Sequence, residues 1–265
     1  MEKVIETYKK QIFEYIGNRI KDGKCVFCGK ELRTGEFCNC KKAVQKNRFF
    51  KKGYNKINEL QNLTISYEDL NGIRQYMASR YTTPKKFEGM DFDSYIIESE
   101  SERKGFNAVF EYYNQAVKNY VAGMNLILLG KYGTGKTMLM SILCDSLAWE
   151  YLFSCKFVNA VDFIQKIVST FGTSDKTVEG VIDNYKTAQF LFLDDIDKVK
   201  PSDYVREIFY AVVNYRTEHE LPTIISANHS LEELDEKFYG EAIVSRLIQD
   251  AKIVNFTHQN RRFQG

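Results

Sequence analysis

Apolar residues follow two alternating patterns along most of the chain. Short, almost continuous apolar runs are typical of strands buried on both faces, and they fall near residues 125–129, 155–159, 189–193, 222–227 and 251–256. Elsewhere, apolar residues at helical spacing predict helices near 105–121, 136–150, 161–170, 177–187, 202–217, 231–237 and 241–248. This alternation predicts an α/β domain in which helices cover both faces of a parallel five-stranded sheet.

The first third of the chain is organised differently. Apolar side chains between residues 4 and 20 have the spacing of one amphipathic helix, and a cysteine-rich stretch follows at about 24–41. A polar stretch then ends in Thr82-Thr83 before Pro84, which is typical of a linker. The sequence therefore predicts a small helical module at 1–60, a linker at 61–83 and the α/β domain at 84–265.

A glycine-rich loop lies between the first strand and the following helix of this domain. Residues 130–137 read GKYGTGKT, which is the pattern G-x-x-x-x-G-K-[ST] of a phosphate-binding loop. A chance glycine turn is the alternative, but the flanking strand and helix favour the loop. In such a loop Lys136 reaches the β- and γ-phosphates of a nucleoside triphosphate, and the Thr137 hydroxyl holds Mg²⁺. The candidate nucleotide contacts are Gly130, Tyr132, Gly133, Thr134, Gly135, Lys136, Thr137 and Met138.

Two further strands end in polar side chains at the edge where ligands bind open α/β sheets. The run Phe190–Leu193 leads into Asp194 and Asp195. We expect Asp194 to bind the hydrated Mg²⁺, and Asp195 to orient the attacking water. An acidic surface turn is the alternative. Asn228 follows the next strand and is placed to hold the same water, although Asn-His-Ser also suits a helix N-cap provided by Ser230.

Four of the six cysteines form the pattern C-x2-C-x9-C-x-C. Such a cluster indicates a metal site rather than disulfides in a cytosolic protein, and four thiolates suit a closed structural Zn²⁺ site. We expect Cys25, Cys28, Cys38 and Cys40 to bind zinc, the alternative being a reduced cluster without metal. Cys144 and Cys155 fall in a predicted helix and strand, where they serve as small core residues.

Charge is distributed unevenly along the chain. The formal net charge is +2, yet residues 1–60 hold 15 basic and 7 acidic side chains. Residues 41–56 have no acidic residue and include aromatic ones. This stretch predicts either a helix that follows a nucleic-acid backbone or one whose aromatic rings pack on the module. No apolar run reaches membrane-spanning length and no signal peptide is visible, so we expect a cytoplasmic protein without a membrane partner.

Several stretches of the α/β domain together resemble one family. They read GKYGTGKT at 130–137, LFLDDID at 191–197, VNYR at 213–216, LPTIISAN at 221–228 and AIVSRL at 242–247. Residues 84–262 are thus similar to the DnaC/DnaI-type helicase loaders, in the initiator branch of AAA+ ATPases. The cysteine module resembles the zinc-bearing, helicase-binding domain of one branch of these loaders. The resemblance implies that the ATPase domain hydrolyses ATP and self-associates. It also implies two partners, namely single-stranded DNA and a hexameric DnaB-like replicative helicase.

The resemblance also implies roles for single residues. Arg246 would be an arginine finger acting on the ATP of a neighbouring subunit; the alternative is a surface arginine paired with Glu241 or Asp250. Contacts to single-stranded DNA would come from Lys166, Thr170, Ser174 and Lys176. Two other functions stay open. One is a transposition-helper ATPase acting on duplex DNA; the other is a helicase-binding adaptor or inhibitor that uses ATP only as a switch. Asp195, where most AAA+ proteins have glutamate, is compatible with the second.

Overall fold

The computed structural model describes residues 83–149, 151, 153–170 and 178–257, together with 20–21, 24–25 and 30–31. In the first third, β1 (Ile20–Lys21) pairs with β2 (Lys24–Cys25) in antiparallel fashion. Residues 4–19 of the predicted helix lie outside the described residues, and its last residue, Ile20, belongs to β1 rather than to a helix. The basic stretch at 41–56 also lies outside the described residues, as do Cys28, Cys38, Cys40, Ser174 and Lys176.

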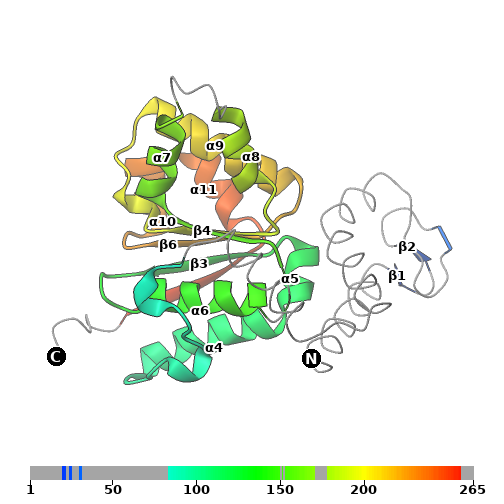
Figure 1. The fold of residues 1–265 in the computed structure, drawn as a ribbon, viewed down its shortest axis with the longest axis vertical. Coiled ribbons are helices and arrows are strands. Elements are labelled where there is room, and N and C mark those ends of the chain that lie inside the picture. The colour runs from blue at the N-terminus through cyan, green and yellow to red at the C-terminus, as the bar shows by residue number, and fades with distance from the viewer. Residues whose placement is uncertain are drawn as a thin grey trace.

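A five-stranded parallel sheet forms the centre of the described domain, as the apolar runs predicted (Figure 1). Its strands are β3 (Asn125–Gly130), β4 (Cys155–Asn159), β5 (Phe190–Asp194), β6 (Thr223–Ala227) and β7 (Ala251–Phe256). Their order is β4-β5-β6-β3-β7, and every neighbouring pair is parallel. The carboxyl ends of β3, β5 and β6 therefore lie side by side at one edge of the sheet, where the predicted site residues are found.

Helices cover both faces of the sheet and enclose two apolar cores (Figure 1). One face carries α4 (Glu100–Asn114), α5 (Ala116–Ala122) and α6 (Lys136–Trp149). The other carries α7 (Ala160–Val168), α8 (Val178–Lys186), α9 (Asp203–Glu218) and α11 (Glu241–Ile248). Successive residues of β3 point to opposite cores: Leu126 and Leu128 to the first, Ile127 and Leu129 to the second. This two-sided burial explains why the strand is a continuous apolar run.

Two predicted helices differ from the structure. The helix expected at 105–121 begins at Glu100, because Ser99 and Glu102 form a capping box, and it is interrupted at Gln115. The Asn119 side chain donates to the carbonyl of Tyr112 at 2.8 Å near this break. The helix expected at 231–237 is one turn of α10 (Leu231–Glu233) followed by the π-helical η4 (Leu234–Tyr239). Ser230 caps α10 with its side chain, as the sequence predicted.

Arg216 is fully buried beneath the amino-terminal ends of β5 and β6. Its guanidinium donates to Thr223 Oγ1 and to the backbone carbonyls of Tyr185, Lys186, Ala188 and Pro222. Burial lowers the pKa of Arg216 to about 9. Three of these carbonyls lie at or just beyond the end of α8, where the helix dipole favours a positive charge. Arg216 thus joins α8, α9 and β6 through hydrogen bonds.

We expect Arg216→Met to lower the free energy of unfolding by about 3 kcal/mol, because several buried carbonyls lose their donor at once. Chemical denaturation of the full chain measures this loss. Arg103→Met is the matched control, since Arg103 lies on the exposed side of α4 and pairs with the exposed Glu100 at 3.7 Å. Equal stability of the two variants would contradict the structural role of Arg216.

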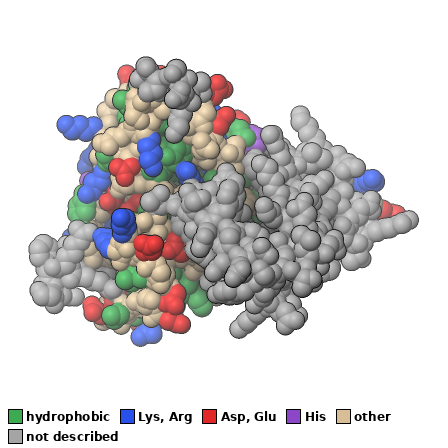
Figure 2. All heavy atoms as spheres, viewed as in Figure 1, with side chains coloured by type: hydrophobic (Ala, Val, Ile, Leu, Met, Phe, Trp, Pro, Cys, Tyr) green, Lys and Arg blue, Asp and Glu red, His purple; other side chains and the backbone are tan. Residues whose placement is uncertain are grey.

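Acidic and basic side chains are mixed over the described part of the domain on the face seen in Figure 2. Charge alone therefore does not single out a nucleic-acid path on this face. None of the helices in the described ranges combines the length and the apolar character needed to cross a bilayer.

Candidate nucleotide-binding site

The glycine loop runs from the end of β3 to the first turn of α6, in the context that the sequence predicted. Gly133 and Gly135 have φ angles of +77° and +81°, which side chains other than glycine rarely adopt. A Cβ on Gly135 would also lie 2.7 Å from the hydroxyl of Tyr95. The loop thus packs closely against residues upstream of α4, and the amino terminus of α6 favours an anion beside it.

Lys136 is the first residue of α6 and is only 5% exposed. Its ammonium donates to the carbonyl oxygens of Gly130 at 2.5 Å and Lys131 at 3.0 Å, and to Asn228 Oδ1 at 3.0 Å. Burial lowers its pKa, while Asp195, Asp197 and Asp194 act against this effect. The ammonium therefore lies between the loop and the carboxylates that follow β5, where it can meet the end of a polyphosphate.

Asp194 ends β5 with a carboxylate that is almost completely buried. Its Oδ1 accepts from Thr137 Oγ1 at 3.1 Å and from Ser226 Oγ at 2.6 Å. Burial raises the pKa of Asp194 to about 6, and a cation beside it would favour the ionised form. The hydroxyl of Thr137 and the carboxylate of Asp194 are oxygen ligands of the kind that Mg²⁺ prefers, and phosphates and water would complete its coordination.

The residues after β5 and β6 form one hydrogen-bonded network. Asp195 has a left-handed backbone with φ +52°, and its N–H donates to Ser226 Oγ at 2.8 Å. Asn228 Nδ2 donates to Asp195 Oδ1 at 3.3 Å and to Asp197 Oδ1 at 3.0 Å. The sequence predictions missed Ser226, Asp197 and His229. The sequence did contain a signal for Ser226, since it lies in β6 two positions before Asn228, and residues two apart along an extended chain point to the same face.

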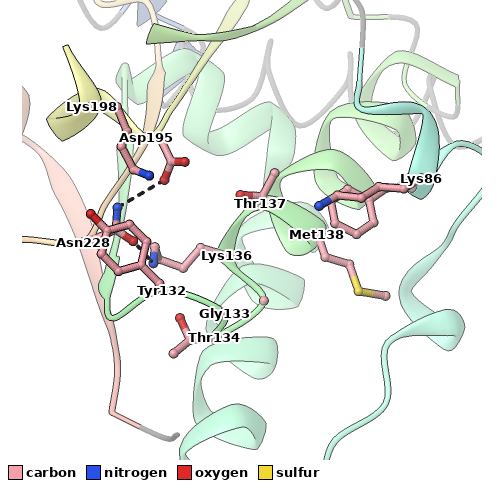
Figure 3. A pocket seen from close by; sticks show the side chains of 12 residues that line it. Lys86, Tyr132, Gly133, Thr134, Lys136, Thr137, Met138, Asp195, Lys198 and Asn228 are labelled. Carbon is pink, nitrogen blue, oxygen red and sulfur yellow. Dashed lines mark hydrogen bonds between the residues drawn. The ribbon is translucent and has the colours of Figure 1, made fainter. Parts of the chain in front are cut away.

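A cavity of about 270 Å³ brings most of the predicted nucleotide contacts together (Figure 3). It is lined by Lys86, Phe87, Tyr132, Gly133, Thr134, Gly135, Lys136, Thr137, Met138, Asp195, Lys198 and Asn228. Asp195, Lys198 and Asn228 lie on one side of the loop, and Lys86 and Met138 on the other. Lys86, Phe87 and Lys198 were not predicted. Lys198 lies over the ring of Tyr132, with Nζ 4.5 Å from its centroid.

Arg246 lies on α11 and does not line this cavity. Its Nε donates to Asn214 Oδ1 at 2.8 Å, its Nη1 to the carbonyl of Ala242 at 2.6 Å and its Nη2 to the hydroxyl of Tyr210 at 3.2 Å. The guanidinium also lies 4.9 Å from the centroid of the Tyr210 ring. These contacts differ from the ion pairs with Glu241 or Asp250 that were the alternative. They hold the guanidinium in one orientation against α9.

The residues considered for DNA contacts fall into three groups. Lys166 is exposed on α7. Thr170 is 8% exposed and donates to the carbonyl of Ile167 at 2.7 Å, and its role as a phosphate contact stays a prediction. Ser174 and Lys176 lie outside the described residues. Cys144 and Cys155 are buried core residues, as predicted.

The parallel sheet, the glycine loop and the acidic strand end define a P-loop nucleotide-binding domain. Residues 126–248 match the family model of the ATPase family associated with various cellular activities (AAA). The sequence is 26% identical to the replicative helicase loader DnaI of Bacillus subtilis, over 98% of this chain and 85% of that protein. It is 25% identical to the replicative helicase loader DnaC of Escherichia coli K12, over 59% of this chain and 62% of that protein.

Solved structures with the same fold include those of two helicase loaders. The crystal structure of the DnaC helicase loader has a TM-score of 0.58 at 21% identity, covering 65% of this chain and 99% of that one. The crystal structure of DnaI has a TM-score of 0.55 at 20% identity, covering 70% of this chain and 99% of that one. The α/β domain thus has the fold of these loaders, residues 126–248 match the AAA family model, and the chain is similar in sequence to replicative helicase loaders.

Proposed function

We propose that this chain is an ATP-dependent loader of a ring-shaped, DnaB-like replicative helicase onto single-stranded DNA. The observation that carries the proposal is the similarity to the DnaI loader along 98% of this chain, the cysteine-rich stretch included. A relationship through the ATPase domain alone would fit many functions of AAA proteins. A similarity that also spans the first third of the chain supports the same kind of protein partner as that of the DnaI loader, in addition to the same kind of ATPase domain.

In this proposal, ATP binds in the cavity between the glycine loop and the carboxylates. Lys136 and the backbone N–H groups of the loop hold the phosphates, and Thr137 and Asp194 hold Mg²⁺. Asp195 orients the attacking water. Met138 lies on the side of the loop away from Asp195, and Phe87 also lines the cavity; both side chains offer apolar contacts to the base. Arg246 reaches the ATP of a neighbouring subunit, which requires the ATPase domains to associate.

In this proposal the module at 1–60 binds the helicase, and Cys25, Cys28, Cys38 and Cys40 of the module bind Zn²⁺. We expect one zinc per chain in protein purified without chelator, because a closed four-thiolate site supplies local folding energy. Metal analysis of the full chain measures this. Among the described residues no group of three or more His, Cys, Asp or Glu is arranged to hold a metal. Cys144→Ala is the matched control and should keep the zinc, while Cys28→Ser should lose it. Zinc-free wild-type protein would contradict the assignment.

Binding of the full chain to the replicative helicase of the same organism tests the partner. We expect a complex on size-exclusion chromatography, and we expect Cys28→Ser to weaken it while leaving ATP binding unchanged. The linker at 61–83 would let the module and the ATPase domain move independently. Helicase that elutes separately from the wild-type chain, with and without ATP, would contradict the proposed partner.

The rate of ATP hydrolysis separates the loader from the adaptor or inhibitor. Asp195 is one methylene shorter than glutamate and is held by Asn228 at 3.3 Å, which is the observation that favours a slow or switch-like enzyme. We expect single-stranded DNA to change the rate of ATP turnover, and Lys166 on α7 is one candidate contact to that DNA. Tight ATP binding without turnover would favour the switch, and a response to duplex DNA alone would favour a transposition helper.

A further inference from the structure

The carboxylate of Asp197 is enclosed behind the nucleotide cavity, and its side chain is 0% exposed. Its Oδ2 accepts from the backbone N–H of Asn228 at 2.7 Å and from that of His229 at 3.1 Å. The same oxygen lies 2.6 Å from His229 Nδ1, and Oδ1 accepts from Asn228 Nδ2 at 3.0 Å. Two consecutive residues after β6 thus make four hydrogen bonds to one buried carboxylate.

These contacts determine how the Asn228 amide is oriented. Its Nδ2 donates to two carboxylates, Asp197 Oδ1 at 3.0 Å and Asp195 Oδ1 at 3.3 Å. An amide oxygen turned toward them would have no donor to accept from, because ionised carboxylates only accept. The amide oxygen therefore faces the other way, where Asn228 Oδ1 lies 3.0 Å from Lys136 Nζ. The cavity receives an acceptor at the end where the γ-phosphate would lie.

His229 completes the enclosure of this carboxylate. Its ring contacts both Asp197, through Nδ1, and Phe238, whose ring centroid is 5.1 Å away. Phe238 belongs to η4, and its carbonyl accepts from Arg206 Nε at 3.0 Å. The π-helical segment, which Arg206 of α9 holds through a hydrogen bond, therefore also contacts His229.

We propose that Asp197 and His229 are positioning residues for ATP hydrolysis, which fix the Asn228 amide with its oxygen toward the attacking water. The inference rests on the proposed ATPase activity. Water forms a bond to the γ-phosphorus as the bond to the β–γ bridging oxygen breaks, and ADP keeps that electron pair. The water donates one hydrogen bond to Asn228 Oδ1 and the other to Asp195. The latter proton passes through Asp195 to the released phosphate. Asp197 touches neither water nor ATP and acts through Asn228.

A double-mutant cycle on the full chain tests this role, with kcat and KM for ATP measured in the absence of helicase and DNA. Asp197→Asn should lower kcat about tenfold with KM changed less than about twofold, a size typical of coupling within one hydrogen-bond network. In the Asn228→Ala background, Asp197→Asn should not lower kcat any further. Asp203→Asn is the matched control, because Asp203 is 96% exposed on α9, and it should leave kcat unchanged.

A second pair of variants keeps the test decisive if Asp197→Asn fails to fold. His229→Asn retains an N–H donor near the position of Nδ1, and His229→Leu removes it at similar size. We expect the asparagine variant to keep most of the turnover and the leucine variant to lose it several-fold at constant KM. Three results would overturn the inference. The two His229 variants could lose turnover equally, the effects of Asp197→Asn and Asn228→Ala on kcat could be additive, or the wild-type protein could show no ATP turnover. If the kcat losses of Asp197→Asn and Asn228→Ala are coupled but the protein does not load helicase, the proposed function is wrong and the positioning role stands.

Discussion

Lys136→Ala should abolish tight ATP binding. In the proposed complex, the ammonium donates to the β- and γ-phosphates, and hydrogen bonds to charged groups contribute about 1.5–3 kcal/mol each. Losing two of them should weaken binding ~100-fold to ~10,000-fold. Titration calorimetry with ATP and Mg²⁺ on the full chain measures the change. The expected result is a dissociation constant beyond the range of the experiment.

The control for this variant is Lys131→Ala, which removes the same charge from an exposed position of the same loop. It should reduce affinity only slightly, because that side chain does not line the cavity. Thermal unfolding should accompany both titrations, since Lys136 also donates to the carbonyls of Gly130 and Lys131. A folded Lys136→Ala protein with wild-type affinity would show that ATP does not bind in this cavity.

Arg246→Ala should lower ATP turnover ~1000-fold while leaving ATP affinity nearly intact, because an arginine finger stabilises charge that develops only in the transition state. We expect turnover to change without affinity because Arg246 does not line the nucleotide cavity of its own chain. Its contacts with Asn214, Ala242 and Tyr210 hold the guanidinium in place before any neighbour arrives. Arg103→Ala, on the opposite helical layer, is the control.

Mixing subunits distinguishes a finger acting on a neighbour from one acting within its own chain. An Arg246→Ala subunit retains its ATP site, and a Lys136→Ala subunit retains its finger. The mixture should therefore recover part of the turnover at shared interfaces, although each variant alone is inactive. Without any recovery over a range of mixing ratios, the assignment of Arg246 to a neighbour's ATP would be wrong.

The sheet could be predicted closely from the sequence, since burial on both faces leaves an unmistakable apolar run. The strand predicted at 189–193 is β5 at Phe190–Asp194, and the one predicted at 251–256 is β7 with the same bounds. The break at Gln115 could not be predicted, because α4 and α5 together carry a continuous helical pattern. The π-helical η4 likewise follows an ordinary helical sequence after Ser230.

The candidate site was predictable where a motif fixes spacing and where strand ends meet. Lys136, Thr137, Asp194, Asp195 and Asn228 are brought together as the order of parallel strands requires. Asp197 and His229 were missed for a physical reason. An acidic residue in a turn and a histidine beside an N-cap are ordinary at a surface, and only the tertiary fold buries that carboxylate between them. Lys86 and Phe87 join the cavity from a segment that carries no motif.

The retention of helicase on closed circular single-stranded DNA tests the central claim most directly, because a ring cannot thread onto a circle unless it is opened. Helicase, full-length chain, ATP and Mg²⁺ are incubated with the circle, and the helicase that co-elutes with DNA is counted. We predict retention that requires the chain and ATP, falls to background with Lys136→Ala, and survives with Lys131→Ala. Equal retention of helicase with and without the wild-type chain would contradict the account.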